Sequence, residues 1–185
     1  MANPQEKIHL NEAQETLLIT LYAKARGCPQ TILDDEKSRQ IMDRVAYDFS
    51  KLKVPIGTSL TVCVRARKLD DYVRQFLERR PDGIILNLGC GLDSRCERVD
   101  YGDTHWYDLD VPDVIDLRKR FFSEAERYHM IPAWVNDPDW MQAIAYQGQP
   151  VFAVAEGLMM YLREQQVKEL VLALKGNFPG CKLAF

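Results

Sequence analysis

Two glycines one residue apart follow a short apolar run near the middle of the sequence. The segment NLGCGLDSR (87–95) comes directly after the apolar residues 84–86. Glycine lacks a Cβ and adopts positive φ at low cost, so a strand that ends at Gly-x-Gly allows a ligand to approach the backbone closely. The turn that contains Gly89 and Gly91 therefore predicts a ligand-binding site at the end of a buried strand.

The sequence after this turn alternates short apolar runs with helical patterns, which is typical of βαβ units and a parallel sheet. We expect strands at 84–88, 104–109, 128–134, 150–156 and 181–185, with connecting helices within 112–128, 137–146 and 163–177. A sheet that ended at the fifth strand would leave a hydrophobic edge uncovered. We therefore expect an α/β fold that is truncated after its fifth strand, as the front part of a larger domain.

The part of the chain before the turn has helical periodicity. Apolar stripes at helical spacing predict helices at about 11–26, 34–49 and 58–80, the last of which stops at Pro81-Asp82-Gly83. The sequence thus predicts two regions, a helical region over residues 1–80 and an α/β core over residues 81–185 that is incomplete at its C-terminus.

Charge and cysteine content exclude several classes of protein. The 24 Lys and Arg residues against 27 Asp and Glu residues give a net charge of -3, which provides no electrostatic reason to bind nucleic acid or an anionic membrane. No apolar run approaches the ~20 residues of a membrane span, and the N-terminus lacks the pattern of a signal peptide. Five cysteines without a C-x-x-C pair indicate free thiols and no metal site. We expect a cytoplasmic protein.

Two classes of ligand are bound by a strand, a glycine turn and a helix, namely dinucleotides and S-adenosylmethionine. The dinucleotide fingerprint G-x-G-x-x-G has a third glycine, whereas this chain has Ser94 in that place and Asp93 beside it. A carboxylate at Asp93 is expected to repel a diphosphate at close range, which favours S-adenosylmethionine. A nicotinamide-dependent oxidoreductase and a non-catalytic adenosyl-binding protein are the alternatives.

Carboxylates follow two later strands. Asp108 and Asp110, 17 and 19 residues after Gly91, stand where one carboxylate could accept both ribose hydroxyl hydrogen bonds; in the alternative, Asp110 only caps the next helix. Glu156 ends a predicted strand, at the ligand-binding edge of the sheet, where it could pair with the cofactor's ammonium. Arg65 could meet the cofactor's carboxylate; an Arg65–Glu156 salt bridge and a solvated Arg65 are the alternatives.

Several stretches in a fixed order resemble one family: RARKLDDYV, ILNLGCGLDSRCERV, WYDLDVPDVIDLRK and VFAVAEGLMMYL. The chain resembles the leucine carboxyl methyltransferase-like family of S-adenosylmethionine-dependent methyltransferases, particularly its bacterial polyketide-type O-methyltransferases. The resemblance implies a Rossmann-like class I methyltransferase sheet, with residues 1–80 as an N-terminal helical cover over the cofactor. It also implies methyl transfer to a carboxylate or hydroxyl of a small molecule.

The resemblance implies roles for individual residues. Arg65 matches the arginine that holds the cofactor's carboxylate, and Gly89 and Gly91 match the glycines under its amino-acid part. Asp110 matches the ribose-binding acid, and Glu156 matches the acid near the cofactor's amino end.

Two further positions follow from the same resemblance. Lys24 matches a lysine on the cofactor side. Where some relatives have an Asp-Leu pair against the adenine, this chain has Trp134-Val135, so either Trp134 stacks on the base or Asn136 or Asp137 contacts it. No catalytic residue is assigned, because a carboxylate acceptor is already ionised near neutral pH and needs no general base, whereas a hydroxyl acceptor would benefit from one.

Overall fold

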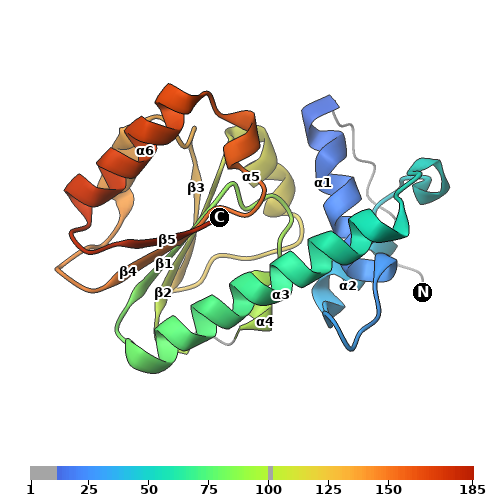
Figure 1. The fold of residues 1–185 in the computed structure, drawn as a ribbon, viewed down its shortest axis with the longest axis horizontal. Helices are drawn as coiled ribbons and strands as arrows, with labels where there is room; N and C mark the ends of the chain where they lie inside the picture. Colours follow the sequence, from blue (N-terminus) through green and yellow to red (C-terminus); the bar gives the residue numbers. More distant parts are fainter. Residues whose placement is uncertain (1–11, 100–101) are drawn as a thin grey trace. The chain divides into compact units, whose positions relative to one another are not determined.

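The computed structural model describes residues 12–99 and 102–185 (Figure 1). These residues form two compact units: unit 1 contains residues up to 70 together with 92–98, and unit 2 contains 71–91 and 99–185. Residues 1–11 of the predicted helical region lie outside the described residues. The functional division into a cover (1–80) and a core (81–185) stays a prediction.

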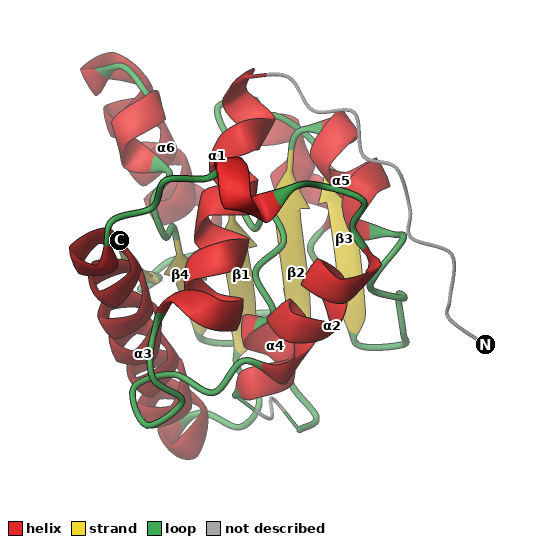
Figure 2. Cartoon of the chain, turned by 90° about the vertical axis from the view of Figure 1, so that its right-hand side faces the viewer, coloured by secondary structure: helices red, strands yellow, loops and turns green. Residues whose placement is uncertain are grey.

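Unit 2 is built on a parallel sheet with the strand order β3-β2-β1-β4-β5, and Figure 2 shows β3, β2, β1 and β4 as neighbours in this order. The strands are β1 (Ile84–Leu88), β2 (His105–Asp110), β3 (Tyr128–Pro132), β4 (Val151–Val154) and β5 (Lys182–Ala184). All five predicted strands and the α/β class are confirmed. Because the chain crosses from β3 to β4 on the other side of β1, the topological switch point lies between β1 and β4. Ligands of such sheets bind outside the carboxyl ends of the strands at this point.

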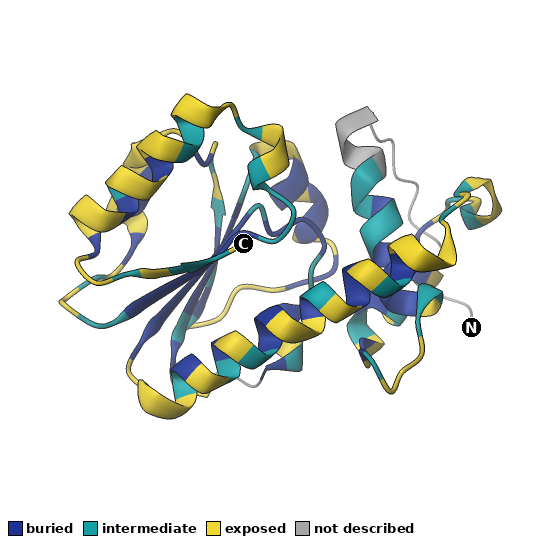
Figure 3. Ribbon diagram, in the orientation of Figure 1, coloured by how far each residue is buried: buried dark blue, intermediate teal, exposed yellow. Residues whose placement is uncertain are grey.

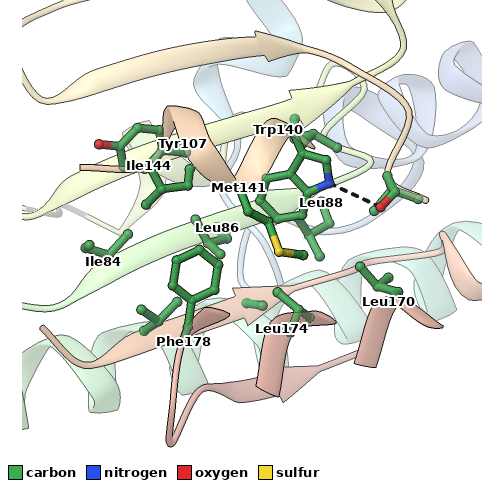
Figure 4. Close-up of a cluster of buried hydrophobic side chains, with 14 of the residues drawn as sticks. Ile84, Leu86, Leu88, Tyr107, Trp140, Met141, Ile144, Leu170, Leu174 and Phe178 are labelled. Atoms are coloured by element: carbon green, nitrogen blue, oxygen red, sulfur yellow. Dashed lines mark hydrogen bonds between the residues drawn. The ribbon is translucent and has the colours of Figure 1, made fainter. Parts of the chain in front are cut away.

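One face of the sheet is covered by α6 (Glu164–Asn177) and by the 3₁₀ segment Pro138–Ala143 (Figure 4). Side chains alternate along a strand, so Ile84, Leu86 and Leu88 of β1 all point to this face. They pack with a buried layer from the two covering segments and the residues that directly follow them: Trp140, Met141, Ile144, Leu170, Leu174 and Phe178. Burial of each large apolar side chain contributes about 1.5–3 kcal/mol, so this layer fixes the central strand from which the glycine turn leaves.

The opposite face of the sheet is covered by the end of α3 (Ile56–Arg79) and by α5 (Pro112–Arg118). The Phe76 ring of α3 lies 5.2 Å from the Phe152 ring of β4, measured between centroids. Helix α5 has Pro112 in its first turn, where the missing N–H costs no helical hydrogen bond. It packs on β2 and β3 next to the polar end of β2.

Unit 1 is helical. It contains α1 (Glu12–Tyr22), which continues as the π-helical turn Ala23–Gly27, then α2 (Glu36–Arg44), the first part of α3 and the four-residue helix α4 (Arg95–Arg98). A Cβ on Gly27 would lie 2.5 Å from Ser59 Oγ of α3. Only glycine therefore allows the π-helical turn to approach α3 this closely.

The predicted helix 34–49 is wrong after Arg44. Helix α2 ends at Arg44 because Val45 is extended, with φ -84° and ψ 124°. Asp48 then caps the separate 3₁₀ turn Phe49–Lys51. The apolar spacing that suggested one helix belongs to two short segments.

The connecting helices are also shorter than expected, with the exception of α6. The predicted helix 112–128 ends at Arg118, and the chain then returns to the sheet through a bridge between Ala125 and Tyr128. The predicted helix 137–146 is a 3₁₀ segment that begins at Pro138. Helix α6 confirms the prediction for 163–177.

The helices have one buried and one exposed side (Figure 3). In α6, for example, Leu170 and Leu174 are buried whereas Val171 and Leu172 are exposed. Within residues 12–99 and 102–185, no helix has both the length and the apolar character that crossing a membrane requires.

Candidate cofactor-binding site

The amides of the glycine turn after β1 are held by the end of β2. The N–H groups of Gly89 and Cys90 both donate to the Leu109 carbonyl, at 2.8 and 3.1 Å. The N–H of Gly91 donates to Asp110 Oδ2 at 2.7 Å. Three successive amides of the turn are therefore engaged, and the turn has a fixed conformation.

The turn needs glycine for its backbone conformation and for space. Gly89 and Gly91 have φ of +65° and +50°, in the left-handed region that L side chains rarely adopt. A Cβ on Gly89 would also lie 3.0 Å from Leu158 Cδ1, because Leu158, in the segment after β4, packs against the turn. The absence of a side chain at Gly89 thus allows the segment that follows β4 to pack against the turn.

The structure distinguishes the two acids at the end of β2. Asp108 is fully buried, and its four lone-pair sites are filled by four donors: Asn87 Nδ2, Trp106 Nε1, Arg118 Nη2 and the Tyr128 hydroxyl. Asp110 is half buried and accepts from the amides of Gly91 and Val111, one on each oxygen. Asp110 therefore keeps acceptor capacity for a ligand, which favours it over Asp108 as the ribose acid.

Asp110 is a partly desolvated acceptor. Burial raises the pKa of Asp110 above its ordinary value, while the hydrogen bonds from Gly91 and Val111 act in the opposite direction. The alternative in which Asp110 caps the next helix is wrong, because Val111 is the N-cap residue of α5 and no side chain caps that end. The carboxylate instead bonds the glycine turn.

Two more predicted site residues follow the strands of unit 2. Glu156 lies two residues beyond β4, next to the switch point, and is half buried. Trp134 follows β3 and has 64% of its surface exposed. Asn136 is exposed, and Asp137 caps the following 3₁₀ segment through a bond from the Asp139 amide. The roles of these residues toward a cofactor stay predictions.

The other two predicted site residues belong to unit 1. Arg65 is half buried on α3, and its contact with the cofactor or with Glu156 stays a prediction. Lys24, in the π-helical turn, is buried and donates to Asp93 Oδ1 at 2.8 Å. The partner of Lys24 in the structure is therefore the acid that follows the glycine turn in the sequence.

Asp93 and Lys24 belong to a buried cluster in unit 1, which we call the six-charge cluster: Lys24, Asp35, Asp70, Asp93, Arg95 and Arg98. Arg98 bridges all three acids, at 2.7 Å from Asp35, 2.7 Å from Asp70 and 3.0 Å from Asp93. Arg95 lies 2.7 Å from Asp70 and 2.9 Å from Asp93. The three acids and three bases balance.

The negative charge of Asp93 is therefore compensated by three cations. The predicted repulsion of a diphosphate is wrong because it assumed an uncompensated charge at Asp93. Two other features disfavour a dinucleotide. The amides of Gly89, Cys90 and Gly91 are already engaged, and α4 has only four residues, too short to supply the dipole that a diphosphate uses at a helix N-terminus. Ser94, in the third fingerprint position, donates to Asp35 Oδ1 at 2.6 Å and so serves the same cluster.

Comparison with known proteins decides the family. The family model described as Leucine carboxyl methyltransferase matches residues 19–175, which include the glycine turn and all strands but β5. The chain belongs to the leucine carboxyl methyltransferase family. Members named among its relatives are S-adenosylmethionine-dependent methyltransferases, so the chain is a member of a methyltransferase family that uses this cofactor.

Two relatives in this family align with most of the chain. The Tetracenomycin polyketide synthesis O-methyltransferase TcmP of Streptomyces glaucescens is 41% identical over 183 residues, covering 97% of this chain and 67% of TcmP. The S-adenosyl-L-methionine-dependent methyltransferase dpfgK of Gibberella zeae is 36% identical over 190 residues, covering 93% of this chain and 63% of dpfgK. The chain spans less than half of three further relatives.

Among solved structures, magnesium protoporphyrin IX methyltransferase (ChlM) from Synechocystis PCC 6803 with bound SAM gives a TM-score of 0.49 at 10% identity. This match covers 93% of this chain and 75% of ChlM.

Sequence reasoning missed Arg118 in unit 2 and the six-charge cluster in unit 1. Arg118 was overlooked because it lies in the basic run RKR, although its spacing of four from Val114 and three from Ile115 places it on the buried face of α5. The six-charge cluster had no signal in the sequence, since Lys24 and Asp93 are 69 residues apart.

The six-charge cluster predicts a pH dependence of stability. Burial alone would raise the pKa of Asp93, but the charges of Arg95, Lys24 and Arg98 outweigh it and hold this pKa well below its ordinary value. The resulting stabilisation is present above the unfolded-state pKa of about 3.9 and is lost as the pH falls toward the lower folded-state pKa. In Asp93→Asn we expect the free energy of unfolding to fall less steeply below about pH 4.

The measurement is urea unfolding at several pH values between about 2.5 and 6. The exposed Asp113, in the first turn of α5, provides a control, and Asp113→Asn should keep the acid slope of the wild type. Equal slopes in Asp93→Asn and the wild type would show that Asp93 does not carry the effect.

Proposed function

We propose that the chain binds S-adenosylmethionine at the glycine turn and that the protein transfers the methyl group to a hydroxyl or carboxylate oxygen of a small polyketide-type molecule. The hydrogen bond between the Gly91 amide and Asp110 carries the proposal, because it sets a close-approach turn beside a ribose-type acceptor. Family membership supports the methyltransferase class, and the similarity to TcmP, a tetracenomycin polyketide synthesis O-methyltransferase, supports the acceptor class. The polyketide-type acceptor is proposed for this chain from its similarity to TcmP.

The residues of unit 2 fit such a cofactor. Gly89 and Gly91 have no side chains at the end of β1, so the amino-acid part of the cofactor can approach the backbone there. Asp110 has lone pairs for both ribose hydroxyl groups. Glu156 supplies a carboxylate for the ammonium, at the end of the neighbouring strand β4.

The remaining proposed contacts are those implied by family resemblance. Arg65 pairs with the cofactor's carboxylate, for which a guanidinium is well suited. Trp134 stacks on the adenine with its exposed indole. Lys24 is retained among the proposed cofactor-binding residues, and in the structure it donates to Asp93.

S-adenosylmethionine supplies an electrophilic methyl group: an acceptor oxygen lone pair forms the C–O bond as the C–S bond breaks, and the electrons stay on sulfur. The chain's part in such a reaction is to bind, orient and keep water out. A carboxylate acceptor carries no proton near neutral pH, whereas a hydroxyl acceptor must release one. The proposal includes no catalytic base, and the nicotinamide alternative is not proposed because the family is one of methyltransferases.

Calorimetric titration with S-adenosylhomocysteine tests the proposal, with NAD as the parallel control. We expect saturable binding of S-adenosylhomocysteine alone. Methyl transfer from labelled S-adenosylmethionine is then assayed with a set of phenols and carboxylic acids as acceptors. Binding of NAD, or of neither ligand, would contradict the proposed cofactor. Binding without transfer to any acceptor would favour the non-catalytic adenosyl-binding alternative.

We further propose that the protein works in the cytoplasm. All five cysteines are free thiols, which suits a reducing compartment. Burial raises the pKa of Cys63 to about 12, so this thiol stays protonated and donates to the Ala23 carbonyl.

A further inference from the structure

Arg118 is a fully buried cation at the end of α5, inside unit 2. Its Nη1 donates to the Gly91 carbonyl at 2.9 Å, and its Nη2 donates to Asp108 Oδ2. Its Nε donates to the Tyr128 hydroxyl at 3.2 Å, and its guanidinium lies 3.9 Å from the centre of the Phe122 ring. One side chain thus joins the glycine turn, β2 and β3.

The bond from Arg118 completes the restraint on Gly91. Asp110 holds the amide before the Gly91 Cα, and Arg118 holds the carbonyl after it. The two peptide groups on either side of this Cα are therefore both fixed, with φ at +50°. Loss of the carbonyl bond would free the second peptide group and, through it, the direction in which the Gly91 amide meets Asp110.

We propose that Arg118 is a positioning residue of the cofactor site, which sets the conformation of Gly91 and thereby the place of the Asp110 carboxylate. This inference rests on the proposed function, because Gly91 and Asp110 are the residues through which Arg118 acts on the cofactor. The bond that carries this effect runs from Arg118 Nη1 to the Gly91 carbonyl. The charge of Arg118 also acts on Asp110, where it opposes the rise in pKa that burial causes, and the lysine variant described next keeps that charge.

Lysine cannot replace arginine here. Arg118 donates from Nε, Nη1 and Nη2, and its planar guanidinium directs these bonds to β3, the glycine turn and β2 at once. A lysine ammonium would keep the charge beside Asp108 but is a compact point donor on a flexible stem. Arg118→Lys therefore keeps a positive charge beside Asp108, so we expect the variant to fold. It loses the bond to the Gly91 carbonyl, so the glycine turn is less restrained.

We expect Arg118→Lys to bind S-adenosylhomocysteine at least tenfold more weakly than the wild type, by calorimetry at a temperature where both are folded. Lys119→Met, at the exposed neighbouring cation, should leave the affinity unchanged. Trp106→Phe removes another donor of Asp108 without touching Arg118, so it should lower the urea midpoint and keep the affinity within about threefold. Equal affinity of Arg118→Lys and wild type would overturn the inference.

A double-mutant cycle with Asp110→Asn separates positioning from general stability. If Arg118 acts through Gly91 and Asp110, the loss in the double variant is smaller than the product of the two single losses. Independent, multiplicative losses would overturn the inference. Failure of the wild type to bind would reject the proposed function instead. In that case the Gly91 amide resonance, which should shift in unliganded Arg118→Lys but not in Lys119→Met, still tests the role of Arg118.

Discussion

Replacing Gly91 by valine is expected to abolish saturable binding of S-adenosylhomocysteine, with an affinity loss of more than about 100-fold. Gly91 has φ +50°, where a β-branched residue is strongly disfavoured, and its amide and carbonyl are bonded to Asp110 and Arg118. A valine would move the backbone out of this region and break both bonds. Calorimetric titration of the folded variant measures the loss.

The control for this prediction carries the same kind of strain elsewhere. Gly148 has φ +95°, has open space around its Cα, and lies before β4, at the amino ends of the strands. Gly148→Val should lower the unfolding midpoint and retain the affinity for S-adenosylhomocysteine. Undiminished affinity in Gly91→Val would show that the turn does not approach the ligand.

Replacing Asp70 by asparagine is expected to lower the free energy of unfolding by about 3–5 kcal/mol, as for other buried pairs that lose one charge. Asp70 is buried and accepts from Arg95 Nε and from Arg98 Nε, both at 2.7 Å. Asparagine keeps the size of the side chain but leaves the six-charge cluster with one uncompensated positive charge. Urea unfolding at pH 7 measures the change.

The neighbouring residue on α3 is a matched control. Asp71 pairs with Arg74 at 3.2 Å across one turn of the helix, and 40% of each side chain is exposed. Asp71→Asn should cost less than about 0.5 kcal/mol, because an exposed ion pair in water contributes little. Similar losses in the two variants would mean that the cluster does not bear the stability assigned to it.

The strands and the glycine turn were predictable from the sequence because their signals are local. The run 84–88 is apolar except for Asn87 and is buried on both faces, as a central parallel strand should be. Strand β2 ends at Asp110, within one residue of the prediction, so the acid at the ligand-binding edge followed directly. Helix ends were less predictable, since Val45 interrupts α2 by adopting an extended conformation that its spacing did not reveal.

The support of the site was not predictable because it depends on distant pairs. Asp108 and Asp110 look alike in the sequence, and only the four donors around Asp108 show that it is a structural acid. Asp93 was expected to repel a diphosphate, but Lys24 and the two arginines of α4 surround it. From the sequence alone, a charged residue in a helical pattern is predicted to face solvent. Its burial in an ion-pair cluster becomes visible only when its partners in the fold are known.

The composition of unit 1 has a consequence for folding during synthesis. Asp35 and Asp70 are made well before Arg95 and Arg98, which belong to the same unit although β1 intervenes in the chain. A nascent chain that ends before residue 92 would have to bury these two acids without their arginines, which is costly. We therefore expect the helical part to stay incompletely folded on the ribosome until β1 and the glycine turn have emerged.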